Sequence, residues 1–211
     1  RSYAQCPPLC GTETHSLDGL YVDTAGMSQD LINEGIDVSI RPRSLGTIAF
    51  SNDISTELDH QSVNELEIFI SDVCRSKWYY DEPSGSYYRW EEEDDGLDTF
   101  VPTYDLLTPE WQIRVQNIVL LFSDYVVYDA TLHDIRIHYA DGLQPAMFFR
   151  NGQMVSGYWS GLKTDEPLHF LTENELEYNL APGKSWIIFV TGDSVLMPTS
   201  ENGWRLEFAI P

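Results

Sequence analysis

Basic residues are scarce in this sequence. Its 211 residues include 12 Lys and Arg against 34 Asp and Glu, which gives a formal net charge of −22, and the lysines are only Lys77, Lys163 and Lys184. So acidic a surface repels phosphate backbones and anionic lipid headgroups. The composition therefore argues against nucleic acid and against membrane binding through a basic patch. It favours cationic partners or metal ions, although a high charge also serves solubility alone.

Long apolar runs are missing as well. The apolar stretches are short, such as Ile118–Phe122, whereas a membrane-spanning helix needs roughly 20 residues, so we expect no direct membrane span. The sequence begins at Arg1 without a basic and apolar leader, which is the start expected of a processed or excised piece of a longer protein.

Cysteine is rare. Cys6 and Cys10 frame the segment CPPLC, and Cys74 stands alone. A C-x₃-C pair without a second pair is a weak signal for zinc, and it is equally compatible with a local disulfide and with two free thiols. No motif surrounds Cys74, so we expect it to be a small core residue.

Catalytic signatures are absent from the sequence. There is no G-x-S-x-G, no H-E-x-x-H and no glycine-rich phosphate loop. His133 and His138 have opposite parity, so on one strand they point to opposite faces and cannot be adjacent metal ligands. We therefore predict no catalytic residue, no cofactor and no metal site. The 34 acidic residues still leave room for a carboxylate pair, although the sequence gives no separation between them.

One acidic run, Glu91–Asp98, contains a glycine and could offer hard oxygen ligands to calcium. It lacks the D-x-[DN]-x-[DN]-G spacing with a distal Glu that a calcium-binding EF-hand loop requires. We interpret the run as a solvated loop, with a calcium-stabilised structural subunit as the alternative.

The strongest local signal is a β-hairpin. Met147–Arg150 and Met154–Trp159 flank Asn151-Gly152, a pair that supplies the two positive φ angles of a type I′ turn. A second hairpin is predicted where two aromatic-rich runs, Lys77–Tyr80 and Ser86–Trp90, flank a five-residue turn with Pro and Gly.

Further short strands follow from alternation and from apolar runs. They are predicted at Val63–Ile70, Leu106–Trp111, Ile118–Phe122, Leu132–Tyr139, Ser185–Val190 and Trp204–Ile210. One short helix is predicted to end at Asn33, capped by Thr24 or Ser28 and followed by Gly35 at C′. The expected fold is mainly β: a compact antiparallel β-barrel or sandwich with a small N-terminal α/β remnant.

Several segments together resemble a bacterial family of envelope proteins, the YerB-like lipoproteins (domain of unknown function 3048). The resemblance covers roughly residues 65–192. The segments that carry it are KWYYDEPSGSYYRW at Lys77–Trp90, Leu106–Thr108, QNIVLLF at Gln116–Phe122, FFRNGQMVSGYW at Phe148–Trp159, PLHF at Pro167–Phe170 and LAPGKSW at Leu180–Trp186. The resemblance implies that residues 1–62 are the remnant of a preceding domain and residues 63–211 are a C-terminal β domain. It also implies an extracytoplasmic protein of the cell envelope, and it implies no reaction.

Aromatic residues crowd the second hairpin and recur in the other motifs. Alternation places Trp78 and Tyr80 on one face of a strand and Tyr79 on the other, so one set is expected to be exposed. Exposed aromatic side chains anchor protein interfaces or stack on sugars, and the alternative is cross-strand packing inside a twisted sheet. The candidate binding residues are Trp78, Tyr80, Tyr88, Trp159 and Trp186.

The function expected from these observations is that of a non-catalytic, extracytoplasmic interaction or structural module of the bacterial cell envelope, or of a secreted protein. It is expected to bind a protein partner in the envelope or in an extracellular assembly. The alternative is a carboxylate-dependent hydrolase that acts on cell-wall glycan or another carbohydrate.

Overall fold

The computed structural model describes residues 9–10, 21–37, 48–53, 58–93, 97–105, 108–129, 133–137, 142–161 and 167–210. The chain divides into two compact units, Arg1–Ser44 and Leu45–Pro211. Residues 61–62 pair with the second unit as strand β3, and the family boundary expected between residues 62 and 63 stays a prediction.

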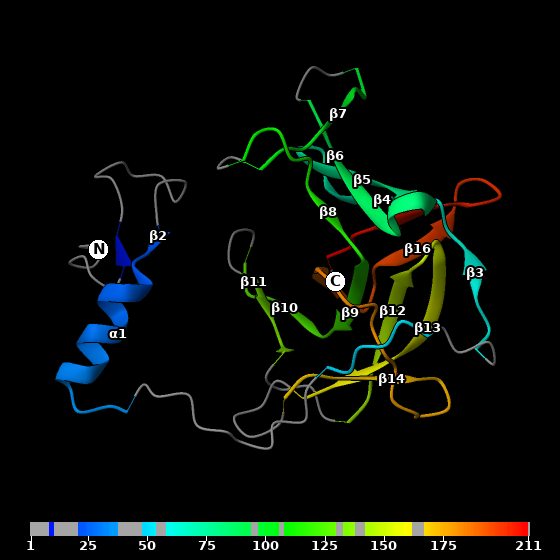
Figure 1. Cartoon of the computed structure of the whole chain (residues 1–211). Coiled ribbons are helices and arrows are strands. Elements are labelled where there is room, and N and C mark those ends of the chain that lie inside the picture. Colours follow the sequence, from blue (N-terminus) through cyan, green and yellow to red (C-terminus); the bar gives the residue numbers. More distant parts are fainter. Residues whose placement is uncertain are drawn as a thin grey trace. The chain divides into compact units, whose positions relative to one another are not determined.

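The first unit is small and holds a helix (Figure 1). Strand β1 (Leu9–Cys10) pairs antiparallel with β2 (Tyr21–Val22), and helix α1 spans Thr24–Asn33. The cap is Asp23, whose carboxylate accepts a hydrogen bond from the Gly26 amide at 2.9 Å. The predicted caps were wrong because Thr24 is already the first helical residue, whereas an N-cap keeps an extended backbone, as Asp23 does. The predicted helix end is confirmed, with Gly35 at a φ of +77°. Cys6 and the side chain of Cys10 lie outside the described residues.

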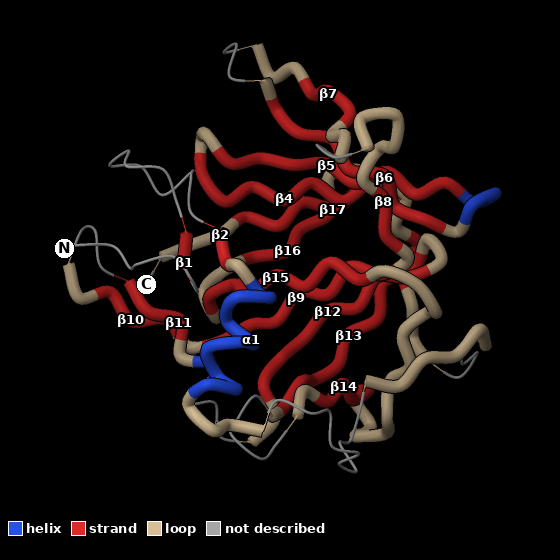
Figure 2. The backbone as a smooth tube through the Cα atoms, turned by 60° about the vertical axis from the view of Figure 1, so that its left-hand side comes forward, coloured by secondary structure: helices blue, strands red, loops and turns tan. Residues whose placement is uncertain are grey.

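Two sheets build the second unit. The strands of the first sheet run in the order β14-β13-β12-β9-β15, with β3 beside β13. They are β3 (Gln61–Ser62), β9 (Asn117–Ser123), β12 (Gln144–Arg150), β13 (Gln153–Ser160), β14 (His169–Thr172) and β15 (Ser185–Thr191). Figure 2 shows β9, β12, β13 and β14 side by side. The predicted hairpin is confirmed, because Asn151 and Gly152 join β12 to β13 with φ angles of 52° and 69°.

The second sheet runs in the order β16-β17-β4-β5-β6-β7, with β8 beside β6. Its strands are β4 (Glu65–Ser71), β5 (Cys74–Asp81), β6 (Ser86–Glu92), β7 (Phe100–Pro102), β8 (Arg114–Val115), β16 (Val195–Pro198) and β17 (Gly203–Glu207). The second predicted hairpin is also confirmed. Its turn contains the 3₁₀ helix η2 (Glu82–Ser84) and ends at Gly85, which is left-handed with a φ of 61°.

The expectation of antiparallel sheets is confirmed only in part. Strand β15 runs parallel to β9, and β17 runs parallel to β4. Short turn signals predict only hairpins, whereas parallel neighbours are joined by long connections that leave no local pattern. Both sheets end in strands that do not meet each other, so the described strands form no closed barrel.

The two sheets share one hydrophobic core. Trp78 and Leu206 of the second sheet pack in the same cluster as Ile118, Phe149 and Val190 of the first. The opposite face of the first sheet has its own cluster, built on Val119, Phe148 and Trp159 and covered by Tyr178 and Leu180. All seven residues of β9 are therefore buried.

Other predicted elements are shorter or absent. A small ribbon pairs β10 (Tyr125–Val127) with β11 (His133–Ile135), so only part of the strand predicted at Leu132–Tyr139 is seen among the described residues. Residues 108–111 form a bend and a turn rather than a strand. Cys74 is exposed rather than buried, which corrects the core prediction. It follows the two-residue turn after β4, where the chain leaves the core.

Candidate functional site

The outer face of the second sheet is the face of β4, β5, β6 and β17 that points away from the shared core. Strand alternation buries Leu66 and Trp78 on the inner face and turns their chain neighbours outward. The outward side chains combine cations, carboxylates and aromatic rings. They are Glu65, Glu67, Phe69, Arg75, Lys77, Tyr79, Tyr88, Trp90, Glu92, Phe100, Arg114, Arg205 and Glu207. We call this set the aromatic–basic face.

Glu67 lies at the centre of the charged side chains on the aromatic–basic face. The Glu67 carboxylate is 3.1 Å from Arg75, 3.8 Å from Lys77 and 3.6 Å from Arg205, and the residue is only 8% exposed. Three cations therefore surround one nearly buried carboxylate. Glu65, Glu92 and Glu207 pair with the same three cations. Counting Glu67 and Arg114, the face carries four carboxylates and four cations, so its charges balance.

The cations also lie over aromatic rings. Arg205 lies 4.7 Å from the Phe69 ring centroid, and Lys77 lies 4.6 Å from that of Phe100. Arg114 lies 5.7 Å from the ring centroid of Tyr88 and donates a hydrogen bond to its hydroxyl. Such contacts hold the long side chains against the sheet, so the face is ordered before any partner arrives.

Arg75 connects the face to the acidic run of residues 91–98. It pairs with Glu92 at 2.9 Å and with Asp98. The hydrogen bond from Arg75 holds the pKa of Asp98 below its usual value. The described part of the chain contains no group of three or more His, Cys, Asp or Glu side chains placed to hold a metal ion. Residues 94–96 lie outside that part, so calcium binding by this run stays a prediction.

Two of the five predicted binding residues are core residues. Trp78 and Trp159 are both 0% exposed. The Trp78 ring packs at a tilt against the Trp186 ring, with centroids 5.3 Å apart, and the Trp159 indole donates a hydrogen bond to the carbonyl of Phe122 at 2.9 Å. Neither ring can touch a partner in this conformation, because each is enclosed by the cluster it stabilises.

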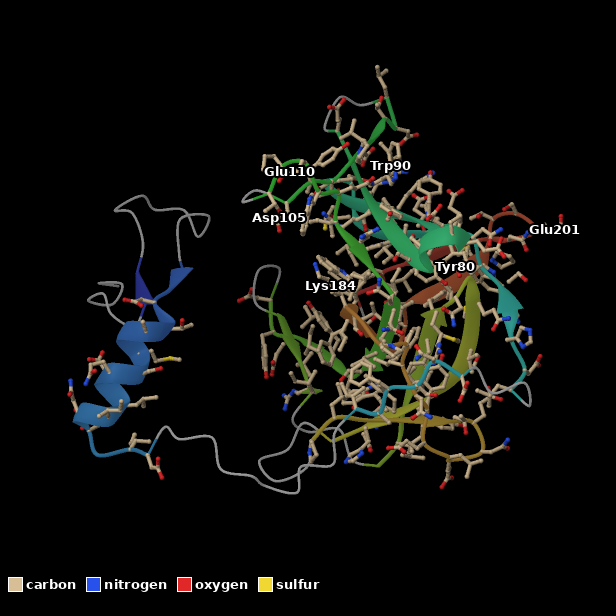
Figure 3. All side chains as sticks on the ribbon, in the orientation of Figure 1. Tyr80, Trp90, Asp105, Glu110, Lys184 and Glu201 are labelled. Carbon is tan, nitrogen blue, oxygen red and sulfur yellow. The ribbon has the colours of Figure 1, made fainter. Side chains whose placement is uncertain are left out.

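The other three residues are half-buried and lie at different places. Tyr88 is on the aromatic–basic face. Tyr80 packs over the turn of the first hairpin, where a Cβ on Gly152 would lie 2.7 Å from its ring. Trp186 lies on β15 with Arg89 over its ring at 5.4 Å. Figure 3 labels Tyr80 near the turn of its hairpin and Trp90 near the other end. Binding by these residues stays a prediction.

Sequence reasoning missed Trp90 and the neighbouring loop. The loop between β7 and β8 exposes Tyr104 at 48% and Trp111 at 67%. It belongs to the same sheet region, because both flanking strands pair with β6. Strand alternation in the sequence could have located part of this face. Arg75, Lys77 and Tyr79 have the opposite parity to the buried Trp78, which assigns them to the outer face.

A second surface feature is the edge of the first sheet. Strand β15 pairs with β9 on one side, and no described strand lies on its other side. Its sequence, Ser185–Thr191, is uncharged and rich in β-branched and aromatic residues, and Ile187 is 36% exposed. An edge of this kind can accept another extended segment.

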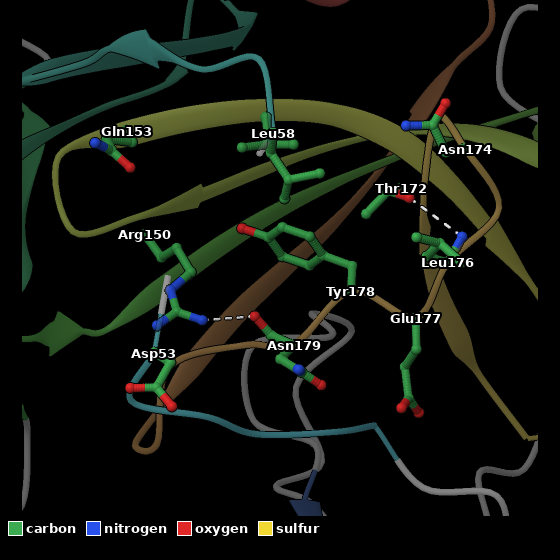
Figure 4. A pocket seen from close by; sticks show the side chains of 11 residues that line it. Asp53, Leu58, Arg150, Gln153, Thr172, Asn174, Leu176, Glu177, Tyr178 and Asn179 are labelled. Atoms are coloured by element: carbon green, nitrogen blue, oxygen red, sulfur yellow. Dashed lines mark hydrogen bonds between the residues drawn. The ribbon is translucent and has the colours of Figure 1, made fainter. Parts of the chain in front are cut away.

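A pocket of about 140 Å³ lies over the far face of the first sheet (Figure 4). Arg150 and Gln153 contribute from the first hairpin, and the covering segments contribute Asp53, Glu177 and Tyr178. Arg150 is 4% exposed. The pocket lies on the first sheet, whereas the aromatic–basic face belongs to the second.

Comparison with known proteins identifies the family of this chain. The C-terminal domain of DUF3048, a protein of unknown function, matches residues 66–187, more than half of the chain. This chain therefore belongs to the DUF3048 family, and the resemblance noted in its motifs is confirmed. No curated protein matches.

The crystal structure of the YerB protein from Bacillus subtilis is similar in fold. The TM-score is 0.58 at 15% sequence identity, and the match covers 87% of this chain and 56% of that one. The chain therefore spans little more than half the length of that relative. In the described residues, no helix is long and apolar enough to cross a membrane.

Proposed function

We propose that this chain is a non-catalytic interaction module of the bacterial cell envelope, and that it binds a protein partner through the aromatic–basic face. The observation that carries the proposal is the concentration of cations and aromatic rings on one sheet face of a chain whose net charge is −22. Aromatic and Arg side chains are the residues most enriched at binding hot spots.

The face suits a mixed-charge protein surface, because it carries four cations and four carboxylates. Four of the 12 cationic residues of the chain lie here, namely Arg75, Lys77, Arg114 and Arg205. Phe100, Tyr88 and Trp90 offer rigid apolar area beside them. The exposed Trp111 adds a large side chain at the rim, where a partner that covers the face would also contact it.

The remaining parts of the proposal rest on the fold and on the family. The shared core between two open sheets supports a two-layered, sandwich-like architecture. The extracytoplasmic location rests on the resemblance to envelope lipoproteins. The free edge of β15 supports a second contact by strand addition.

Site-specific photo-cross-linking in the native host tests the proposal. A photoreactive phenylalanine analogue replaces Trp111 in one variant and the exposed Glu175, in the turn after β14 of the first sheet, in a matched control. We expect one protein adduct at position 111 and none at position 175, in the envelope fraction. A second change, Arg114→Glu, should abolish the adduct because it reverses one charge of the face. Equal labelling at both positions, or an adduct that survives Arg114→Glu, would refute the proposed surface.

The hydrolase alternative stays a prediction. Asp53 and Glu177 are the acidic residues that line the pocket on the first sheet. If they form a catalytic pair, the intact chain should release sugars from peptidoglycan, and Asp53→Asn and Glu177→Gln should each abolish that release.

A further inference from the structure

Arg150 is held at the base of the pocket by backbone carbonyls. It is the last residue of β12, opposite Gln153 on β13 and Asn117 on β9. Its guanidinium donates one hydrogen bond to the carbonyl of Asn179 at 2.6 Å and one to the carbonyl of Ser51 at 3.0 Å. Its Nε is buried and has no hydrogen-bond partner among the described residues. The two bonds fix the plane of the guanidinium and leave other N–H groups unused.

Arg150 forms no ion pair within the described part of the chain. No described carboxylate oxygen lies within 4.0 Å of it, whereas four other arginines have such partners. Those four are Arg75, Arg89, Arg136 and Arg205. A charge that is 96% removed from solvent is costly unless an opposite charge approaches it. In a chain with 34 acidic residues, an unpaired arginine at this depth points to an external anion.

Two further donors face the same pocket. Tyr178 is 4% exposed, and its ring stacks on Phe148 at 4.2 Å. Burial raises the pKa of Tyr178 to about 12, so its hydroxyl stays protonated at neutral pH. Figure 4 shows the Tyr178 hydroxyl directed toward the side of the pocket that holds Arg150 and Gln153. No described residue is hydrogen-bonded to that hydroxyl or to the Gln153 side chain.

The rim limits the charge and size of the ligand. Asp53 and Glu177 are exposed carboxylates at the opening, and they repel a dianion more strongly than a monoanion. The volume of about 140 Å³ is below the roughly 300–1,000 Å³ of pockets for drug-sized ligands. A planar carboxylate can accept hydrogen bonds from the fork of a guanidinium and carries only one charge, so it fits both the donor and the rim.

We propose that this pocket binds a small monocarboxylate, whose oxygens accept hydrogen bonds from the Arg150 guanidinium and the Tyr178 hydroxyl. The site is independent of the aromatic–basic face, so either proposal can fail without the other.

The test uses the full chain and sodium acetate as the probe, with acetamide as an uncharged control of similar shape. Amide resonances are followed by NMR at pH 7 and constant ionic strength. We expect saturable shifts at Gly152, Gln153 and Asn179 with acetate and none with acetamide. Inorganic phosphate is titrated in parallel and should bind more weakly than acetate.

Four variants assign the effect. Arg150→Lys keeps a charge but loses the fork and should weaken acetate binding about tenfold or more. Tyr178→Phe keeps the stacked ring and should weaken it about threefold. Asp53→Asn removes a repelling charge and should tighten it about threefold. Tyr104→Phe, an exposed tyrosine elsewhere, is the control and should change nothing.

Three outcomes would overturn the inference. One is the absence of saturable shifts at the pocket. Another is equal binding of acetate and acetamide, or tighter binding of phosphate. The third is acetate binding that persists unchanged in Tyr178→Phe and Asp53→Asn, two variants that remove no core packing and so keep the test valid if Arg150→Lys fails to fold.

Discussion

The two sheets of the larger unit differ in how their faces are covered. The first sheet is covered on both faces, so β9 has only buried residues and its neighbours Phe148 and Trp159 are 0% exposed. The described residues cover the second sheet on one face only. Its other face carries charged pairs and half-buried aromatic rings around Glu67. The first sheet is therefore a scaffold, and the second sheet is the one that presents a surface.

The difference shows why aromatic content alone is a poor guide to a binding surface. Trp78 and Trp90 lie on adjacent strands of one hairpin, yet they face opposite ways. Trp78 joins the shared core, whereas Trp90 packs edge-on against Tyr79 at 5.7 Å on the outer face. What separates the two residues is the parity of the strand, not the type of side chain.

The largest expected effect contrasts one tryptophan from each sheet. Trp159→Ala removes a buried ring and an indole hydrogen bond, and should lower the free energy of unfolding by about 4 kcal/mol. Trp90→Ala removes a cross-strand contact at the surface and should lower it by about 1 kcal/mol. Urea denaturation of both variants measures the difference. Equal losses would mean that the outer face is as important to the fold as the core.

The next largest loss of stability is expected where two backbone segments of the first sheet lie very close together. A Cβ on Gly157 would lie 2.2 Å from the carbonyl oxygen of Leu171 on β14. Gly157→Ala should therefore destabilise the chain by about 2 kcal/mol, because backbone has to move. Gly192 is the matched control, since a Cβ there meets nothing within 4 Å. Thermal unfolding should show a drop for Gly157→Ala and little change for Gly192→Ala, and similar drops would contradict the close approach.

A smaller loss of stability is expected when a charge on the second sheet is removed. Glu67→Gln keeps the shape of the side chain but removes the carboxylate from among three cations, and should lower the free energy of unfolding by about 2 kcal/mol or less. Glu91→Gln, at an exposed ion pair with Arg89, should change it by less than about 1 kcal/mol. Chemical denaturation at low and high salt checks this. The ranking would be wrong if both variants behaved alike.

The smallest expected effect is a pH dependence at the border of the aromatic–basic face. The pKa of Asp98 is lowered from its ordinary value of 3.8, chiefly by the hydrogen bond from Arg75. A lowered pKa contributes stability that is fully present above pH 3.8 and is lost as the pH falls through the lower folded value. Asp98→Asn should therefore flatten the acid end of the stability profile slightly. A profile identical to that of the parent chain would show that the exposed pair contributes nothing.

The sequence predicted the elements with strong local chemistry. Asn151-Gly152 and the turn before Gly85 were located correctly, because only residues that tolerate positive φ fit there. Strand β9 followed from a continuous apolar run. The parallel neighbours β15 and β17 were not foreseen as parallel, since nothing in a strand records which distant strand lies beside it.

The site was less predictable than the fold. The sequence made Tyr80 a candidate binding residue, but in the structure its ring packs over Gly152 of the other hairpin. Arg150 reads as an ordinary basic residue at the end of a strand, and only the covering segments at Ser51 and Asn179 make it a buried charge.

The sequence by itself determined that the chain is mainly β, acidic and built on two glycine-containing hairpins, because turn geometry and strand alternation act over a few residues. Only the tertiary structure decided which aromatic rings are core, which cations share Glu67, and which buried arginine has no acidic partner among the described residues. Those properties depend on contacts between residues far apart in the chain, and burial and electrostatic pairing exist only once those residues meet.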